Sequence, residues 1–172
     1  MPAETRSRTK VFRAVRELCD GCRMCEMACS LNKTGVINPH LARIRIAFSE
    51  TNPYPAPIIC RHCKNPPCKT VCPVEGAMTL DERTGAVAIN EQTCIGCLAC
   101  VDACPFGAIQ VGPNKQVLKC DLCGGDPTCV KYCPPRPEES LPKDAVTGRA
   151  CLQYLEPHQV TAGKRQSQAD KE

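Results

Sequence analysis

Cysteine is the residue type in this sequence whose number and spacing could do chemistry. The chain has 17 cysteines in 172 residues, and all but one fall into four tight runs that each open with CxxC and close with a three-residue gap. The runs are Cys19, Cys22, Cys25 and Cys29; Cys60, Cys63, Cys68 and Cys72; Cys94, Cys97, Cys100 and Cys104; and Cys120, Cys123, Cys129 and Cys133. Thiolate sets of this density ligate metal ions or inorganic clusters.

The first and third runs have the spacing C-x2-C-x2-C-x3-C. In bacterial ferredoxins this spacing lets three cysteines hold one [4Fe–4S] cluster while the fourth ligates a neighbouring cluster. The second and fourth runs keep the same order with two and three extra residues in the middle gap. No nucleophile–base pattern, phosphate-binding loop or open metal site accompanies the runs. The sequence therefore predicts an electron carrier with four [4Fe–4S] clusters, and not an enzyme.

Dense cysteine also occurs in structural zinc sites and in disulfide frameworks. Zinc takes four ligands, usually as two separated pairs, and does not need the shared fourth cysteine of each run. Disulfide scaffolds belong mainly to exported chains. Residues 1–10 are basic with no apolar run behind them, so they are not a signal peptide, and no stretch approaches the length of a transmembrane helix. We expect a cytoplasmic protein without a membrane span, and keep a zinc scaffold as the non-redox alternative.

The remaining candidate ligands lie outside the pattern. His62 falls within the second run, where all four expected thiolates are present, so we expect it to tune a cluster or lie exposed. Cys151 is the odd cysteine, and we expect a buried small residue or an idle thiol. His40 and His158 have no partner pattern.

Short elements must position the runs, because aromatic residues make up only 3% of the chain and there is no Trp to build a large core. Alternating residues 42–48 predict a half-buried strand, and 78–80 with 86–89 and 109–111 with 116–118 predict two hairpins. Short helices should lead from the third to the fourth cysteine of a run, as over 98–103. We expect a short helix within 145–155 and a polar tail over 163–172.

Elements this short bury little surface, so metal binding should supply folding free energy and the apo chain should be largely unfolded. The runs form an internal repeat of two-cluster modules, and runs two and three are separated by little more than a hairpin. The predicted fold is α+β: two bacterial-ferredoxin-like two-cluster modules, one inserted in the other, with short hairpins and short helices. Residues 1–50 and 106–137 form the outer module, 51–105 the inserted module, and 138–172 a C-terminal extension.

Four stretches carry a resemblance to a known family: 60–68 (CRHCKNPPC), 94–97 (CIGC), 103–109 (ACPFGAI) and 119–123 (KCDLC). Over about residues 10–135 the chain resembles the four-cluster iron–sulfur subunits of molybdenum- and tungsten-enzyme complexes, which include those of dimethyl sulfoxide reductase, formate dehydrogenase and formate hydrogenlyase. In its short form it looks most like the small iron–sulfur subunit of tungsten aldehyde oxidoreductase complexes. The first run departs by ending in Cys29-Ser30, and the chain beyond Pro135 lies outside the resemblance.

The resemblance implies that each cluster takes three cysteines of one run and the last cysteine of another. Runs one and four would hold one cluster on Cys19, Cys22, Cys25 and Cys133 and a second on Cys120, Cys123, Cys129 and Cys29. Runs two and three would hold one on Cys60, Cys63, Cys68 and Cys104 and a second on Cys94, Cys97, Cys100 and Cys72. No ligand position is replaced, so four cubanes are expected.

Charge and resemblance together indicate the partners. Four oxidised cubanes of about −2 each, thiolates included, change the formal +4 of the chain to roughly −4, so its basic residues are counter-charge and not a nucleic-acid site. The resemblance implies a catalytic molybdenum or tungsten subunit, such as an aldehyde oxidoreductase, and a second redox subunit or carrier. A free soluble polyferredoxin shuttle is the alternative. Self-association is left open by the sequence.

Overall fold

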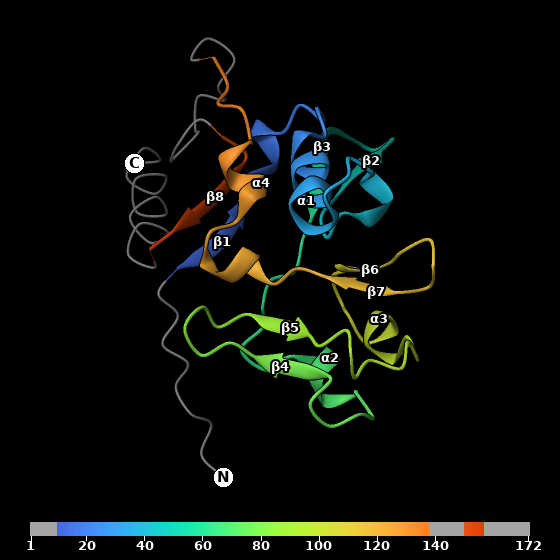
Figure 1. Cartoon of the computed structure of the whole chain (residues 1–172). Helices are drawn as coiled ribbons and strands as arrows, with labels where there is room; N and C mark the ends of the chain where they lie inside the picture. The colour runs from blue at the N-terminus through green and yellow to red at the C-terminus, as the bar shows by residue number, and fades with distance from the viewer. Residues whose placement is uncertain (1–9, 138–149, 157–172) are drawn as a thin grey trace.

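The computed structural model of the chain describes residues 10–137 and 150–156 (Figure 1). Its strands are β1 (Val11–Ala14), β2 (Arg45–Ser49), β3 (Asn52–Ile58), β4 (Met78–Leu80), β5 (Val87–Ile89), β6 (Ile109–Val111), β7 (Val117–Lys119) and β8 (Leu152–Leu155). Its helices are α1 (Met24–Thr34), α2 (Pro67–Thr70), α3 (Ala99–Asp102) and α4 (Thr128–Lys131), with 3-10 turns η1 (Arg16–Leu18), η2 (Pro39–Leu41) and η3 (Leu122–Gly125). The fold is a small mixed arrangement of short hairpins and short helices.

The two predicted hairpins are confirmed. β4 pairs antiparallel with β5, with Met78 opposite Ile89, and β6 pairs with β7, with Ile109 opposite Lys119. In each hairpin a polar turn joins strands of three residues whose apolar side chains are mostly buried, as at Val87, although Val111 at the end of β6 is exposed. Strands this short are not stable alone in water, so their order depends on what they pack against.

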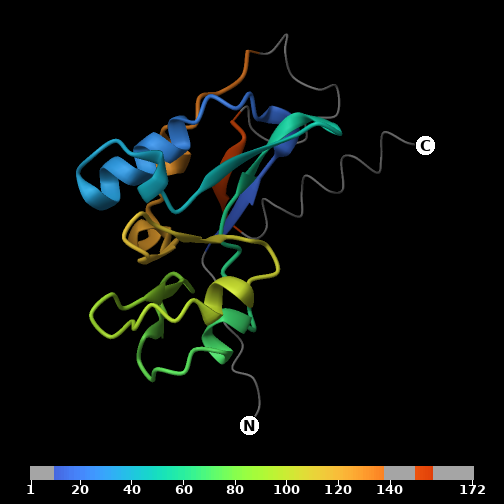
Figure 2. The ribbon, with the colours of Figure 1, turned by 90° about the vertical axis from the view of Figure 1, so that its right-hand side faces the viewer.

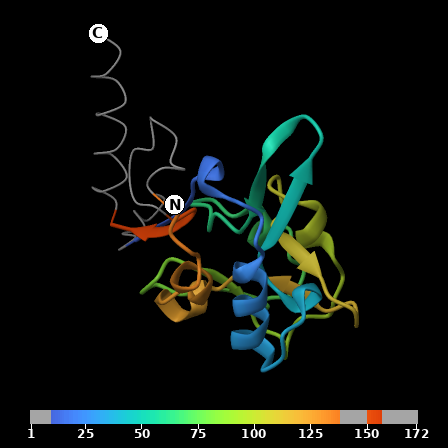
Figure 3. The ribbon, with the colours of Figure 1, turned by 90° about the horizontal axis from the view of Figure 1, so that it is seen from above.

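The strand predicted over 42–48 begins three residues further along the chain, as β2, and pairs with β3. Ala42, Ile44 and Ile46 are buried as the alternation requires, but the Phe48 ring is 61% exposed. The partner strand β3 was not predicted because it contains three prolines. Prolines at every second position place the missing N–H groups on one edge of the strand, so the other edge is free to pair with β2. The β2–β3 hairpin projects from the body (Figures 2 and 3).

The predicted helix within 145–155 is wrong where the structure describes it, because Leu152–Leu155 form strand β8. β8 pairs antiparallel with β1, with Phe12 opposite Tyr154 and the two rings 6.5 Å apart between centroids. Cross-strand pairs of this kind stabilise a two-stranded sheet and are invisible to a reading of local periodicity. Residues 145–149 and the predicted tail over 163–172 lie outside the described residues.

Each helix carries the third cysteine of a run. α2, α3 and α4 contain Cys68, Cys100 and Cys129 and end before the fourth cysteine, as predicted for 98–103. α1 is longer and carries both Cys25 and Cys29 on successive turns. Each helix therefore fixes the direction in which the sulfur atom of that third cysteine points.

The buried side chains form two clusters. One gathers β8, α1, β2 and part of the fourth run, and includes Leu18, Ile44 and Leu152. The other lies between the two short hairpins and includes Met78, Val87 and Val117. In Figures 1 and 2 these clusters correspond to two stacked bodies, with β4, β5, α2 and α3 in the lower one. Cysteines contribute to both clusters, so the cores and the candidate sites are the same regions of the molecule.

Candidate iron–sulfur cluster sites

The cysteines border three cavities of nearly equal size, with about 350, 330 and 340 Å³ of space free of protein atoms. We number them along the chain by the run that opens each. The first cavity is lined by Cys19, Cys22, Cys25 and Cys133. The second is lined by Cys60, Cys63, Cys68 and Cys104, and the third by Cys72, Cys94, Cys97 and Cys100. Each cavity thus collects three cysteines of one run and the last cysteine of another.

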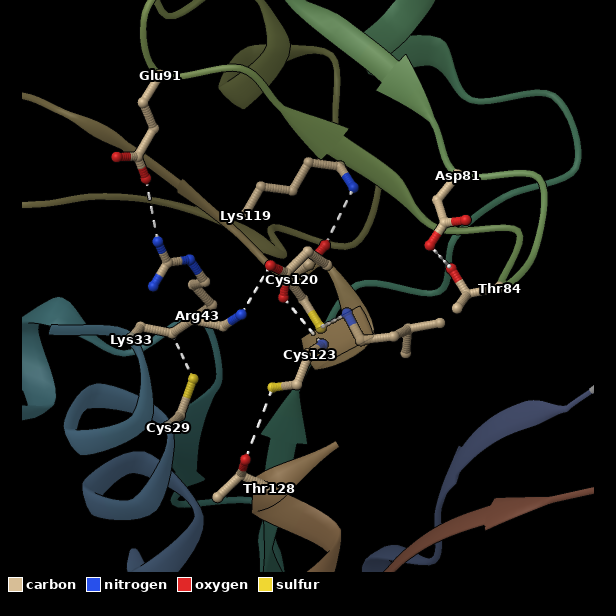
Figure 4. Close-up of polar contacts among 12 residues, drawn as sticks. Cys29, Lys33, Arg43, Asp81, Thr84, Glu91, Lys119, Cys120, Cys123 and Thr128 are labelled. Atoms are coloured by element: carbon tan, nitrogen blue, oxygen red, sulfur yellow. Dashed lines mark hydrogen bonds and ion pairs between the residues drawn. The ribbon is translucent and has the colours of Figure 1, made fainter. Parts of the chain in front are cut away.

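The four remaining run cysteines also lie together, and we refer to Cys29, Cys120, Cys123 and Cys129 as the fourth set. Burial raises the pKa of Cys129, and the nearby sulfurs of Cys120, Cys29 and Cys123 add to the shift. Helix α1 packs against α4, which brings Cys29 from the first run to the fourth. Figure 4 shows the Cys29 and Cys123 sulfurs lying near one another, with Thr128 Oγ1 directed at Cys123.

The same backbone conformation recurs in the opening CxxC of all four runs. The residue before the second cysteine has a positive φ in every case: Gly21 at 75°, His62 at 46°, Gly96 at 68° and Leu122 at 58°. Glycine adopts this region without strain, whereas a residue with a Cβ pays for it. The repeat read from cysteine spacing is therefore also a repeat of chain geometry. It turns the loop so that it wraps around a cavity.

This turn directs backbone amides at the cysteine sulfurs. The His62 N–H donates to Cys60 Sγ at 3.4 Å, and the Leu122 N–H donates to Cys120 Sγ at 3.4 Å. The last cysteine of a run is bonded from further away, as by the Arg43 N–H to Cys29 Sγ at 3.3 Å. Amide donors stabilise negative charge on sulfur, so these bonds suit thiolates better than neutral thiols.

Burial makes ionisation of the deepest thiols unfavourable unless something positive binds them. It raises the pKa of Cys25 and of Cys120 to about 12, and that of Cys100 to about 11. A buried acid keeps its proton because the low-dielectric interior disfavours its charged form. Iron binding at these sulfurs must therefore release protons, which couples metal affinity to pH.

Three buried polar side chains near the cysteines were not foreseen as structural residues. The Lys119 ammonium, on a residue only 3% exposed, donates to the Val87 carbonyl and lines the second cavity. Glu26 on α1 accepts the Ile46 N–H at 2.8 Å and so fixes β2 to the helix. His62 is buried with its Nδ1 accepting the Val87 N–H at 3.2 Å, so the expected alternative of an exposed His62 is excluded. Nothing in the sequence indicated that these three side chains are buried, because hydrophilic residues are expected at the surface.

The donor sets fit a [4Fe–4S] cluster. A cubane needs four thiolates spread around its volume, one for each iron, and the sets at the three cavities each border space of similar size. Within residues 10–137 and 150–156, no three His, Cys, Asp or Glu side chains come close enough to hold one metal ion. The odd thiol, Cys151, also borders the first cavity.

Two family matches agree with this geometry. Residues 52–140 match the 4Fe–4S dicluster domain family, and residues 16–34 match a 4Fe–4S binding domain. The chain belongs to the 4Fe–4S dicluster domain family. It is an iron–sulfur electron-transfer protein with multiple [4Fe–4S] clusters, as the sequence predicted.

Curated relatives extend the match along the chain. The polyferredoxin-like subunit of the aliphatic sulfonate oxidoreductase of Pyrococcus furiosus is 46% identical over 118 residues, 67% of this chain and 66% of the relative. The ferredoxin MJ0265 of Methanocaldococcus jannaschii, which is uncharacterized, is 38% identical over 154 residues, 88% and 76% of the two chains. Formate hydrogenlyase subunit 2 of Escherichia coli is 32% identical over 155 residues, 68% and 74% of the two chains.

Among solved structures, the active site complex BamBC of benzoyl coenzyme A reductase with benzoyl-CoA aligns with 94% of this chain and 91% of that chain, at 18% identity and a TM-score of 0.44.

None of the helices in residues 10–137 and 150–156 has both the length and the apolar character needed to cross a bilayer.

Proposed function

We propose that this dicluster-family chain holds four [4Fe–4S] clusters and conducts electrons between a catalytic oxidoreductase subunit and a second redox partner. The observation that carries the proposal is the sorting of the cysteines. Each of the three cavities, and the fourth set, combines three cysteines of one run with the last of another. A [4Fe–4S] cluster supplies a one-electron carrier whose potential is set by charge, hydrogen bonds and solvent exposure.

In this proposal each cavity corresponds to one ligand set. The first takes Cys19, Cys22, Cys25 and Cys133; the second takes Cys60, Cys63, Cys68 and Cys104; the third takes Cys94, Cys97, Cys100 and Cys72; and the fourth set is Cys120, Cys123, Cys129 and Cys29. Runs two and three then form an inserted module (51–105) within an outer one (1–50 and 106–137). The packing of α1 against α4 supports the outer module, because this contact joins its two segments, and β8 of the C-terminal extension adds to the module by pairing with β1.

The exposure of the cysteines supports a path with two ends. Cys22 at the first cavity and Cys97 at the third are exposed, whereas Cys60, Cys120 and Cys129 are buried. The neighbour of Cys97 in its loop, Ile95, is 68% exposed and extends the apolar surface there. Electron transfer to a partner requires close approach, so the surfaces at Cys22 and Cys97 are the proposed entry and exit points. In this proposal electrons pass from one surface to the other through the clusters at the second cavity and the fourth set.

The partner assignment rests on the relatives. One is described as a subunit of an aliphatic sulfonate oxidoreductase and another as a subunit of formate hydrogenlyase. We infer that this chain is the non-catalytic electron-transfer subunit of a comparable complex, with a molybdenum or tungsten catalytic subunit, such as an aldehyde oxidoreductase, as the specific proposal. The reduced thiols needed for cluster ligation fit a cytoplasmic location.

The first test is an anaerobic assay of iron and acid-labile sulfide, with visible spectra before and after dithionite. The proposal requires about sixteen irons and sixteen sulfides per chain, from four cubanes, and a broad visible band that bleaches on reduction. A colourless protein with about four zinc ions and no sulfide would leave a structural scaffold instead.

A free polyferredoxin shuttle is the second candidate, favoured by the description of one relative as polyferredoxin-like. Native purification separates the two. A catalytic subunit that co-purifies in fixed ratio supports the docked subunit, and a cluster-loaded monomer that reduces several enzymes supports the shuttle.

A further inference from the structure

Cys151 is the one cysteine outside the four runs, and it is buried at 3% exposure against the first cavity. This cavity is therefore lined by five thiols, whereas the second and third are lined by four each. Four thiolates complete a cubane. The fifth needs a different explanation.

Strand pairing fixes the position of Cys151. It directly precedes β8, whose Leu152 lies opposite Ala14 of β1. The Cys151 carbonyl accepts the Val15 N–H at 2.8 Å, so the register continues one residue past the strand. β1 leads through η1 straight to Cys19, and the sheet thereby holds the odd thiol beside the first ligand of the first run.

Segment 150–152 directs three donors at two ligand sulfurs. The Cys151 thiol lies beside the Cys19 sulfur in the lining of the first cavity, within hydrogen-bonding contact of it. A cluster would hold Cys19 as a thiolate, which has no proton to donate, so Cys151 is the donor and Cys19 the acceptor. The Leu152 N–H donates to Cys133 Sγ at 3.4 Å, and the Cys151 N–H donates to the same sulfur.

The first cysteine of another run accepts fewer hydrogen bonds at its sulfur than Cys19 does. Cys60 and Cys120 each accept the amide of the residue two positions on, and Cys19 accepts the equivalent Gly21 amide as well. The bond from the Cys151 thiol is thus an addition at the first cavity to a pattern that the runs share. It comes from a part of the chain beyond both family matches, which cover residues 16–34 and 52–140.

We propose that the Cys151 thiol is a tuning group for the cluster at the first cavity, and raises the reduction potential of that cluster by donating a hydrogen bond to Cys19. Reduction adds negative charge that is shared with the ligand sulfurs, so a donor to such a sulfur favours the reduced state. The inference rests on the proposed function, because it requires a cluster at this site. Cys151 acts through Cys19 and is a positioning residue, not a ligand.

The test uses the full chain with three substitutions. Cys151→Ala and Cys151→Val remove the donor, the first with a smaller side chain and the second with a slightly larger one, and Cys151→Ser keeps an O–H donor at the same place. Each protein is purified anaerobically, its iron and sulfide are counted, and its clusters are titrated by potentiometry with electron paramagnetic resonance (EPR) detection. We expect all three to keep the iron content of the unsubstituted chain.

One cluster should become harder to reduce in the Ala and Val variants by about tenfold in its reduction equilibrium constant, equal to a fall of about 59 mV for a one-electron couple. The Ser variant should keep the potential near its original value or above it, and the other clusters should not shift. Unchanged potentials with full iron would overturn the inference and leave the proposed function intact. Loss of about four irons from both Ala and Val variants would make Cys151 a ligand and also overturn it. An unsubstituted chain without iron would defeat the proposed function itself.

Discussion

The Lys33 ammonium lies 2.7 Å from the Asp121 carboxylate, across 88 residues of sequence. Lys33 belongs to α1, the helix of the first run, and Asp121 lies between the first two cysteines of the fourth. The second carboxylate oxygen accepts the Cys123 N–H at 3.0 Å. Burial opposes ionisation of Asp121, but the Lys33 bond and the Cys123 amide outweigh it and hold its pKa below the usual range. One carboxylate therefore ties two runs together and shapes a cysteine loop.

Substitutions at Asp121 separate these two roles. Asp121→Asn keeps an acceptor for the Cys123 amide and loses the charge pair, which is partly exposed, so we expect a loss of up to about 1 kcal/mol in unfolding free energy. Asp121→Ala also loses the amide bond and should cost about 1 kcal/mol more. Denaturant unfolding followed by visible absorption measures both.

The Lys131–Asp126 pair provides the control, since its side chains are 55% and 70% exposed. Asp126→Asn should change stability very little. Equal losses in Asp121→Asn and Asp121→Ala would mean that the loop hydrogen bond contributes nothing.

Two glycines at equivalent positions should differ in their tolerance of a methyl group. Gly96→Ala meets only the Lys115 carbonyl, at 4.0 Å, so its cost is the left-handed backbone alone, about 1–2 kcal/mol. Gly21→Ala has the same backbone cost and also places a Cβ 2.9 Å from the Phe48 ring. Thermal unfolding of the two holoproteins should rank Gly21→Ala as the less stable.

Truncating the obstructing ring tests that explanation. In the Phe48→Ala background, Gly21→Ala should lose most of its cost beyond that of Gly96→Ala, because the backbone strain is left together with only the looser contact to Pro55 Cγ at 3.1 Å. If the gap between the two glycines persists without the ring, steric contact with Phe48 is not its source.

The sequence predicted the hairpins, the helix over 98–103 and the 4Fe–4S ferredoxin-like character of the chain, because cysteine spacing and turn residues are local signals. β8 was missed because its order comes from pairing with β1 more than a hundred residues away. β3 was missed because its prolines argue against a strand unless the partner edge is known. Burial of Lys119 was equally hidden, since a lysine is expected at the surface until the Val87 carbonyl is placed beside it.

Acidification should release iron from the holoprotein. Without metal, burial raises the pKa of Cys25 and Cys120 to about 12, so these thiols rebind protons at every pH below that value. Ligation requires the thiolate, so affinity should fall by about tenfold per pH unit for each such ligand as pH decreases. Bleaching of the visible band in the presence of an iron chelator should be faster at low pH, and a pH-independent rate would contradict this.

In the proposed arrangement each cluster is ligated by cysteines of two runs. This arrangement and one in which each run ligates its own cluster predict opposite results for two double variants. If Cys72 serves the third cavity with Cys97, then Cys72→Ala, Cys97→Ala and their double variant should alter the same single cluster in the EPR spectrum of the reduced protein. Combining Cys72→Ala with Cys63→Ala should alter two, because Cys63 lines the second cavity. Ligation within runs gives the opposite outcome, with one altered cluster for Cys72 with Cys63 and two for Cys72 with Cys97. The two double variants carry the same number of substitutions, so general damage to the fold affects both alike and the comparison reports on ligand sharing.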